Sequence, residues 1–217
     1  MDRQFWEDKW KMNEIGFHQQ DTSPKLQQYW PLLQLPAGST VFVPLCGKSL
    51  DILWLAAQGF NVVGVELSAL AVQAFFAENS LSAECEPFGN LMRWKSGPIT
   101  IYQGDVFELT DSMLQSVDAV FDRAALIALP EKMRQHYVSH LKRILPDNCK
   151  TLLITLHYDQ QQMSGPPFSV TPQEVGALYN NWCSIDHLES TEVIEQEGKF
   201  KSRGLTSVKE SLFILNS

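Results

Sequence analysis

The chain has 217 residues, of which 44% are hydrophobic and 19% are charged, a composition typical of a globular protein. This length suits one large α/β domain, which buries enough apolar surface to fold without disulfides or metal ions. The net charge of −8, from 17 basic and 25 acidic residues, argues against nucleic acid or an anionic membrane as the main partner.

The four cysteines are far apart in the sequence and form no CxxC pair, so we expect reduced thiols and no metal site. The first fourteen residues carry charges throughout and lack the apolar core of a signal peptide. The chain also lacks an apolar run near the roughly 20 residues that span a bilayer. We therefore expect a cytoplasmic protein with no membrane partner.

The first half of the chain alternates predicted helices and strands. Short helices are expected over 3–14 and 23–33, and a helix over 49–58 carries Leu50, Leu53, Trp54 and Ala57 on one face. Ser68 is the expected N-cap of a further helix. The turn-forming residues 95–98 predict a turn or hairpin. Strands are expected over Thr40–Val43, 61–65 and 99–102.

The second half continues this alternation and then breaks it. We expect a strand over 117–121, a helix between Pro130 and Pro146, a strand over 151–156 and a helix from Pro172. The β-rich runs 183–193 and 205–215 have no helix between them, so they should be antiparallel. The layout predicts an α/β fold, a Rossmann-like class I methyltransferase with a mostly parallel seven-stranded sheet and terminal antiparallel strands.

The segment from Val41 to Ser68 carries the strongest functional signal. A parallel strand–helix–strand unit places the turn around Gly47 and the acid Glu66, 19 residues later, at the same edge of the sheet. An exposed carboxylate there could accept hydrogen bonds from the ribose of an adenosine-containing cofactor. The alternative is a solvated acid at the N-terminus of the next helix; the upstream turn favours the ribose ligand.

The residues of the turn indicate which cofactor is bound. It ends in Gly47-Lys48-Ser49, but a phosphate-binding Walker A loop would need glycine at the position of Phe42. A GxGxxG motif is also missing, so the turn is too bulky for the pyrophosphate of NAD or FAD. S-adenosylmethionine has no phosphate, and the turn therefore favours methyl transfer over a nicotinamide-dependent oxidoreductase.

Two further strand ends offer candidate residues. Asp105 and Val106 follow the strand at 99–102 and could contact adenine, although an ordinary turn aspartate is nearly as good an interpretation. Arg123 follows the strand at 117–121, near the point where ligands bind in open α/β sheets. It could contact the cofactor's carboxylate or stabilise an anionic nucleophile. The structural alternative is an ion pair between Arg123 and Asp122.

The histidines and the N-terminal aromatic residues each allow two interpretations. His136 and His140 lie four apart on one helix, where surface histidines are a better interpretation than a metal site. His157 follows the strand at 151–156 at the functional edge. Trp6, Trp10 and Phe17 could be packing residues, or they could belong to an N-terminal lid that shields the cofactor and stacks on a flat substrate.

These strings together resemble the thiopurine S-methyltransferase family, in its shorter bacterial form. The resemblance covers nearly the whole chain, and PLCGKS and FDRAAL are far more specific than a general Rossmann signal. It rests on WEDKW at 6–10, GFHQ at 16–19, PLCGKS at 44–49, VVGVELS at 62–68, FDRAAL at 121–126 and GPPF at 165–168.

The resemblance implies a single S-adenosylmethionine-dependent methyltransferase domain over 1–217, with residues 1–38 as an N-terminal lid. It implies a cytoplasmic monomer that methylates the sulfur of thiopurines and other aromatic thiols, and also selenium or tellurium compounds. Substrate contacts are implied at Phe17 and Lys199. The residues that it matches to S-adenosylmethionine contacts are Trp10, Leu45, Glu66, Asp105, Val106 and Arg123.

Arg123 is also the expected catalytic residue, because a positive charge near the acceptor thiol would lower its pKa and favour the thiolate. An alternative outside the enzymes is a regulator that binds the cofactor without catalysis, and it would carry the same cofactor-binding residues. The combination of Arg123 with an aromatic cover favours a working active site.

Overall fold

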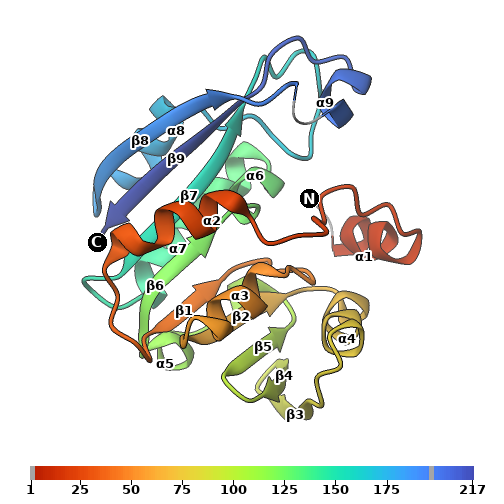
Figure 1. Cartoon of the computed structure of the whole chain (residues 1–217), viewed down its shortest axis with the longest axis vertical. Coiled ribbons are helices and arrows are strands. Elements are labelled where there is room, and N and C mark those ends of the chain that lie inside the picture. Colours follow the sequence, from red (N-terminus) through yellow and green to blue (C-terminus); the bar gives the residue numbers. More distant parts are fainter. Residues whose placement is uncertain (1–2, 196–197) are drawn as a thin grey trace. The chain divides into compact units, whose positions relative to one another are not determined.

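The computed structural model describes residues 3–195 and 198–217, apart from the Lys199 side chain. The chain divides into two compact units. The first contains the chain up to residue 120 together with 144–146, and the second contains residues 121–143 and 147–217. Figure 1 shows the course of the chain through both.

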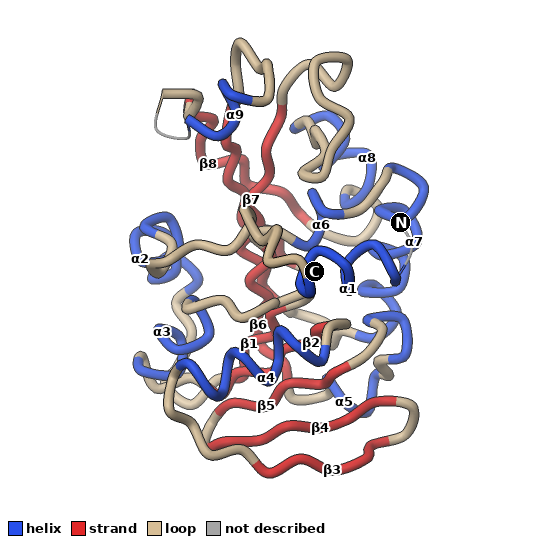
Figure 2. The backbone as a smooth tube through the Cα atoms, turned by 90° about the vertical axis from the view of Figure 1, so that its right-hand side faces the viewer, coloured by secondary structure: helices blue, strands red, loops and turns tan. Residues whose placement is uncertain are grey.

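The first unit is built on strands in the order β3-β4-β5-β2-β1-β6. The strands β5, β2, β1 and β6 are parallel, and β3 and β4 extend them as an antiparallel hairpin, seen along one edge in Figure 2. Strand β1 is buried throughout, as expected for a central parallel strand covered on both faces. The strands are β1 (Thr40–Val43), β2 (Asn61–Glu66), β3 (Glu84–Phe88), β4 (Leu91–Ser96), β5 (Ile99–Gln103) and β6 (Val117–Asp122), of which the last two residues belong to the second unit.

Two helices of this unit begin at a capping serine, Ser23 or Ser68. The Ser68 hydroxyl accepts a hydrogen bond from the Ala71 amide at 3.4 Å, which confirms the predicted N-cap of α4. The expected helix over 23–33 instead divides into α2 and a 3-10 turn beginning at Trp30. The helices are α1 (Arg3–Lys11), α2 (Pro24–Tyr29), α3 (Asp51–Ala57), α4 (Ala69–Glu78) and α5 (Asp111–Leu114), with 3-10 turns η1 (Trp30–Leu33) and η2 (Val106–Glu108).

The second unit contains β7 (Lys150–His157), β8 (Ser184–Glu192) and β9 (Lys209–Asn216), with β9 antiparallel to both neighbours. The expected antiparallel pair is therefore confirmed, although a short helix, α9 (Gly198–Ser202), lies between its strands where none was expected. Its helices are α6 (Ala125–Ala128), α7 (Glu131–Ile144), α8 (Pro172–Tyr179) and α9 (Gly198–Ser202). Among the described residues, a helix long and apolar enough to cross a lipid bilayer is not found.

The expected number of strands needs correction. All seven predicted strands form, but the described part of the chain contains nine, because β3 and β4 were not predicted as strands. Strand β3 reads Glu-Cys-Glu-Pro-Phe and is almost wholly exposed, so it lacks the apolar alternation of a half-buried strand. The turn expected at 95–98 does form, between β4 and β5.

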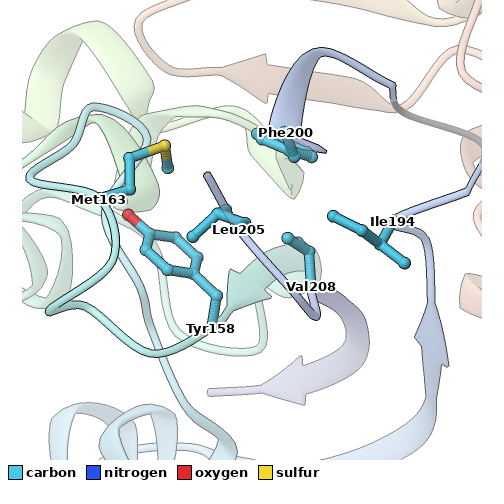
Figure 3. Close-up of a cluster of buried hydrophobic side chains, with 6 residues drawn as sticks. All are labelled: Tyr158, Met163, Ile194, Phe200, Leu205 and Val208. Carbon is cyan, nitrogen blue, oxygen red and sulfur yellow. The ribbon is translucent and has the colours of Figure 1, made fainter. Parts of the chain in front are cut away.

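A small apolar cluster stabilises the region that follows β7. It joins the end of this strand, the loop beyond it and the segment around α9, and Figure 3 shows Leu205 lying between Tyr158 and Val208. The Tyr158 hydroxyl also donates a hydrogen bond to the Pro167 carbonyl at 2.5 Å. The apolar cluster and this hydrogen bond thus hold the loop that carries GPPF in place. The cluster comprises Tyr158, Met163, Ile194, Phe200, Leu205 and Val208.

Gly64 in β2 offers a test of how tightly the strand packs on the turn. A Cβ at this position would lie 2.8 Å from the Cys46 sulfur, so Gly64→Ala must displace the Cys46 side chain, the turn or the strand. We expect the free energy of unfolding to fall by about 1–3 kcal/mol, measured by urea denaturation. Gly16→Ala is the control, because a Cβ there meets no atom within 4 Å. Equal stability of the two variants would show that the contact is easily relaxed.

Candidate functional site

The turn after β1 reverses the chain within a few residues. Leu45 has a φ of 45° and Gly47 a φ of 53°, so both adopt the left-handed region. The Cys46 amide between them donates to the Val65 carbonyl at 2.9 Å, which fixes the turn against β2. The Gly47 amide then points at the Glu66 carboxylate, 2.8 Å away.

Glu66 is a buried acid and not the exposed one that we expected. Its side chain ends β2 with only 7% of the residue exposed. One oxygen accepts from Gly47 and the other from the Ser68 amide at 2.8 Å. Burial raises the pKa of the Glu66 carboxyl, and these amides limit the rise. The interpretation as a solvated acid at the helix N-terminus is also wrong, because the turn covers the carboxylate.

An aromatic group from the N-terminal segment covers this turn. A Cβ added at Gly47 would lie 3.2 Å from the Trp10 ring, so the indole rests directly on the turn. Phe17 meets Trp10 edge-on at 5.5 Å between ring centroids, and Trp6 at 5.6 Å. Phe17 remains 37% exposed. Trp10, Trp6 and Phe17 thus form an aromatic cover on the turn, and their role as a lid stays a prediction.

The expected adenine-side residues lie at the next strand end. The Gly104 amide donates to the Glu66 carbonyl at 2.8 Å, which places the residues after β5 beside the end of β2. Asp105 caps η2 by accepting from the Phe107 amide at 3.0 Å, as an ordinary turn aspartate would. Asp105 is nevertheless exposed and lines a pocket of about 490 Å³ together with Gln103 and Asn90. Val106 is buried.

Arg123 directly follows β6 and is half-buried in the second unit. Its neighbour Asp122 is fully buried and accepts three hydrogen bonds. The donors are the amides of Ala125 and Leu126, at 3.1 Å and 3.2 Å, and the Tyr137 hydroxyl at 2.9 Å. Asp122 was expected only as a partner for Arg123, and its bond with Tyr137, fifteen residues further along the chain, was not predicted.

The structure thus brings Trp10, Leu45, Glu66 and the Asp105–Val106 pair together in the first unit, and it places Arg123 in the second. Lys199 belongs to α9, and its side chain lies outside the described residues.

Three histidines that the sequence singled out have clear positions. His140 is buried and its ring contacts the Arg143 guanidinium at 2.7 Å, so its assignment as a surface histidine is wrong. His136 is exposed on the same helix, as expected. His157 is half-buried and contacts the Ser211 hydroxyl at 3.3 Å.

The buried Asp122 makes stability depend on pH. Burial raises its pKa from 3.8 to about 6. The folded state therefore holds a proton that the unfolded state releases, and the associated stability is present below pH 4 and lost as pH rises through 6. Tyr137 and Tyr179, which lie near this charge, stay neutral because burial raises their pKa values further above 10.

We expect Asp122→Asn to gain stability relative to wild type as pH rises from 4 to 7, by up to about 3 kcal/mol. Thermal and urea unfolding of both proteins across this range measures the difference. A difference that stays constant with pH would mean that Asp122 has an ordinary pKa.

Comparison with known proteins places this geometry in a family. The family model described as thiopurine S-methyltransferase matches residues 1–217. A thiopurine S-methyltransferase of Pseudomonas putida is 46% identical over 216 residues, covering 100% of both chains. One of Bordetella petrii is 47% identical over 215 residues, covering 99% of this chain and 98% of the relative.

Solved structures show the fold. A protein of Methanosarcina mazei described as a SAM-dependent methyltransferase superposes with a TM-score of 0.64 at 16% identity, covering 91% of this chain and 98% of that one. The 1,6-didemethyltoxoflavin-N1-methyltransferase of Burkholderia thailandensis gives a TM-score of 0.65 at 14% identity, covering 99% and 86%. The expected Rossmann-like class I methyltransferase fold is confirmed.

The match to the family over the whole chain also confirms the expected enzyme class and its methyl donor, S-adenosylmethionine. The PLCGKS turn with its buried Glu66, the FDRAAL segment and the N-terminal aromatic cover lie within that match. This chain belongs to the thiopurine S-methyltransferase family.

Proposed function

We propose that this chain transfers a methyl group from S-adenosylmethionine to the sulfur of aromatic and heterocyclic thiols, thiopurines among them. The observation that carries the proposal is the Glu66 carboxylate, held at the turn by Gly47 in a chain 46% identical to enzymes of that name. The acceptor is a small molecule, and neither nucleic acid nor a membrane is a partner.

On the cofactor side, the residues present fit the nucleoside. A carboxylate has about four lone-pair positions, and the Gly47 and Ser68 amides use two of them at Glu66. The remaining capacity suits ribose hydroxyls. Asp105 and Val106 offer a polar group and an apolar surface for the adenine. Trp10 and Leu45 border the turn from which the nucleoside would be held. The bound cofactor supplies an electrophilic methyl group.

On the acceptor side, Phe17, Arg123 and Lys199 are the proposed contacts. The open Phe17 ring suits stacking on a flat heterocycle. Arg123 is the proposed catalytic residue, since its positive charge would stabilise the acceptor as a thiolate, the nucleophilic form. The thioether that leaves is neutral, so its departure requires no acid. Excluding water further favours a step in which opposite charges cancel.

We further propose that residues 1–217 act as one catalytic domain with residues 1–38 as its lid, and that the protein is a cytoplasmic monomer. The net charge of −8 supports solubility. Selenium and tellurium compounds are proposed as additional acceptors, because they are soft nucleophiles like a thiolate.

Glu66→Gln tests the cofactor side. An amide has only one strong acceptor oxygen in place of two, so it cannot serve both backbone amides and the ribose. We expect S-adenosylhomocysteine to bind more weakly, with a loss of binding free energy of about 1–3 kcal/mol, measured by calorimetry. Glu78→Gln is the control: Glu78 also contacts the turn, through Lys48 at 2.7 Å, but it is exposed and should leave affinity unchanged. Unaltered affinity in Glu66→Gln would remove the ribose role.

Turnover of labelled S-adenosylmethionine with a thiopurine, and with selenium and tellurium compounds, tests the reaction and separates an enzyme from a silent cofactor-binding protein. Near neutral pH, we expect Arg123→Ala to lose on the order of 100-fold in kcat and Arg123→Lys to keep part of it. The deficit of Arg123→Ala should shrink as rising pH ionises the thiol unaided. Equal rates for wild type and Arg123→Ala at every pH would refute the catalytic role.

A further inference from the structure

The Asp122 side chain closes a ring around Arg123. One carboxylate oxygen accepts from the amides of Ala125 and Leu126, so the backbone between residues 122 and 125 is tied back onto the acid. Arg123 and Ala124 lie within this ring. Their backbone dihedral angles are therefore limited by the Asp122 hydrogen bonds, and the direction in which the Arg123 side chain leaves the backbone is limited with them.

The second oxygen of Asp122 fastens the ring to a helix. It accepts from the Tyr137 hydroxyl at 2.9 Å, and Tyr137 is fully buried in α7. The helix is itself anchored, because the buried Arg134 guanidinium donates to the Leu129 carbonyl at 2.8 Å and to Glu174 of α8 at 2.6 Å. Hydrogen bonds thus connect the backbone around Arg123, through Asp122 and Tyr137, to α7, which is itself bonded to α8.

The same ring is connected to the loop that carries GPPF. The Phe168 amide donates to the Ile127 carbonyl of α6 at 2.6 Å, close to the end of the FDRAAL segment. The preceding Pro167 carbonyl accepts from Tyr158. Hydrogen bonds therefore connect the FDRAAL and GPPF motifs, which lie about forty residues apart in sequence. A shift of the Asp122 ring would move both motifs.

A buried carboxylate is an expensive way to hold a loop. Removing an acid from water carries a penalty of several kcal/mol, which hydrogen bonds only partly offset. Asparagine could accept the same two amides without a charge. An acid at this position is therefore not explained by stability alone, and its side chain immediately precedes the proposed catalytic cation.

We propose that Asp122 and Tyr137 are positioning residues that set the orientation of Arg123 for methyl transfer. The inference rests on the proposed function of Arg123. Neither residue needs to touch the cofactor or the acceptor. Their replacement should lower the rate of methyl transfer only when Arg123 is present. This dependence distinguishes a positioning role from a merely structural one.

A double-mutant cycle between Tyr137→Phe and Arg123→Ala measures this dependence. We expect Tyr137→Phe to lower kcat about tenfold when Arg123 is present and less than twofold in the Arg123→Ala background. Tyr179→Phe is the matched control, because it removes a hydroxyl from another buried tyrosine near the Asp122 charge and should leave kcat unchanged. Equal losses in both backgrounds would overturn the inference.

A second measurement does not depend on turnover. NMR relaxation of the Arg123 Nε–H group, assigned from its loss in Arg123→Lys, reports how firmly the side chain is held. We expect its order parameter to fall in Tyr137→Phe and in Asp122→Ala but not in Tyr179→Phe. An unchanged order parameter in both variants would refute positioning. A wild-type protein without turnover would instead refute the proposed function, and the NMR result would still decide whether the pair orients Arg123.

Discussion

The hydrogen bond between the Glu66 carboxylate and the Gly47 amide is the interaction on which the proposed cofactor site depends. It joins the turn after β1 to the end of β2 across 19 residues, and it does so inside the protein, where a carboxylate without donors would be costly. Because the Ser68 amide occupies the other oxygen, the same acid also starts α4. One side chain thus connects the strand, the turn and the helix.

The same device recurs at other strand ends. Asp105 after β5 accepts from Phe107, and Asp122 at the end of β6 accepts from Ala125 and Leu126. In each case an acid at the carboxyl end of a parallel strand captures amides of the segment that follows, which would otherwise lack partners. The three acids differ in burial, and burial decides which of them a small molecule can reach. Asp105 is exposed, whereas Asp122 is buried and can act only through its neighbours.

Local patterns predicted much of this fold, and the failures have physical causes. Thr40–Val43 and the Ser68 cap were predicted correctly because apolar runs and capping side chains act within a few residues. Strands β3 and β4 were not predicted because β3 is almost wholly exposed and is held by pairing with β4, which in turn pairs with β5. The burial of Glu66 and the bond from Tyr137 to Asp122 depend on distant segments. Composition and spacing carry no record of such contacts.

The turn after β1 contains a single glycine, and the conformations of Leu45 and Gly47 explain why one is enough. Leu45 sits in the left-handed region at a cost of roughly 1 kcal/mol or more, and the bond from Cys46 to Val65 helps to hold it there. Gly47 faces two independent demands, a φ of 53° and the Trp10 ring 3.2 Å from where a Cβ would lie. Glycine is therefore needed here for approach by an indole, not by a pyrophosphate. A single glycine then suffices, and the bulky neighbours that argue against a dinucleotide become compatible with a nucleoside bound beneath an aromatic cover.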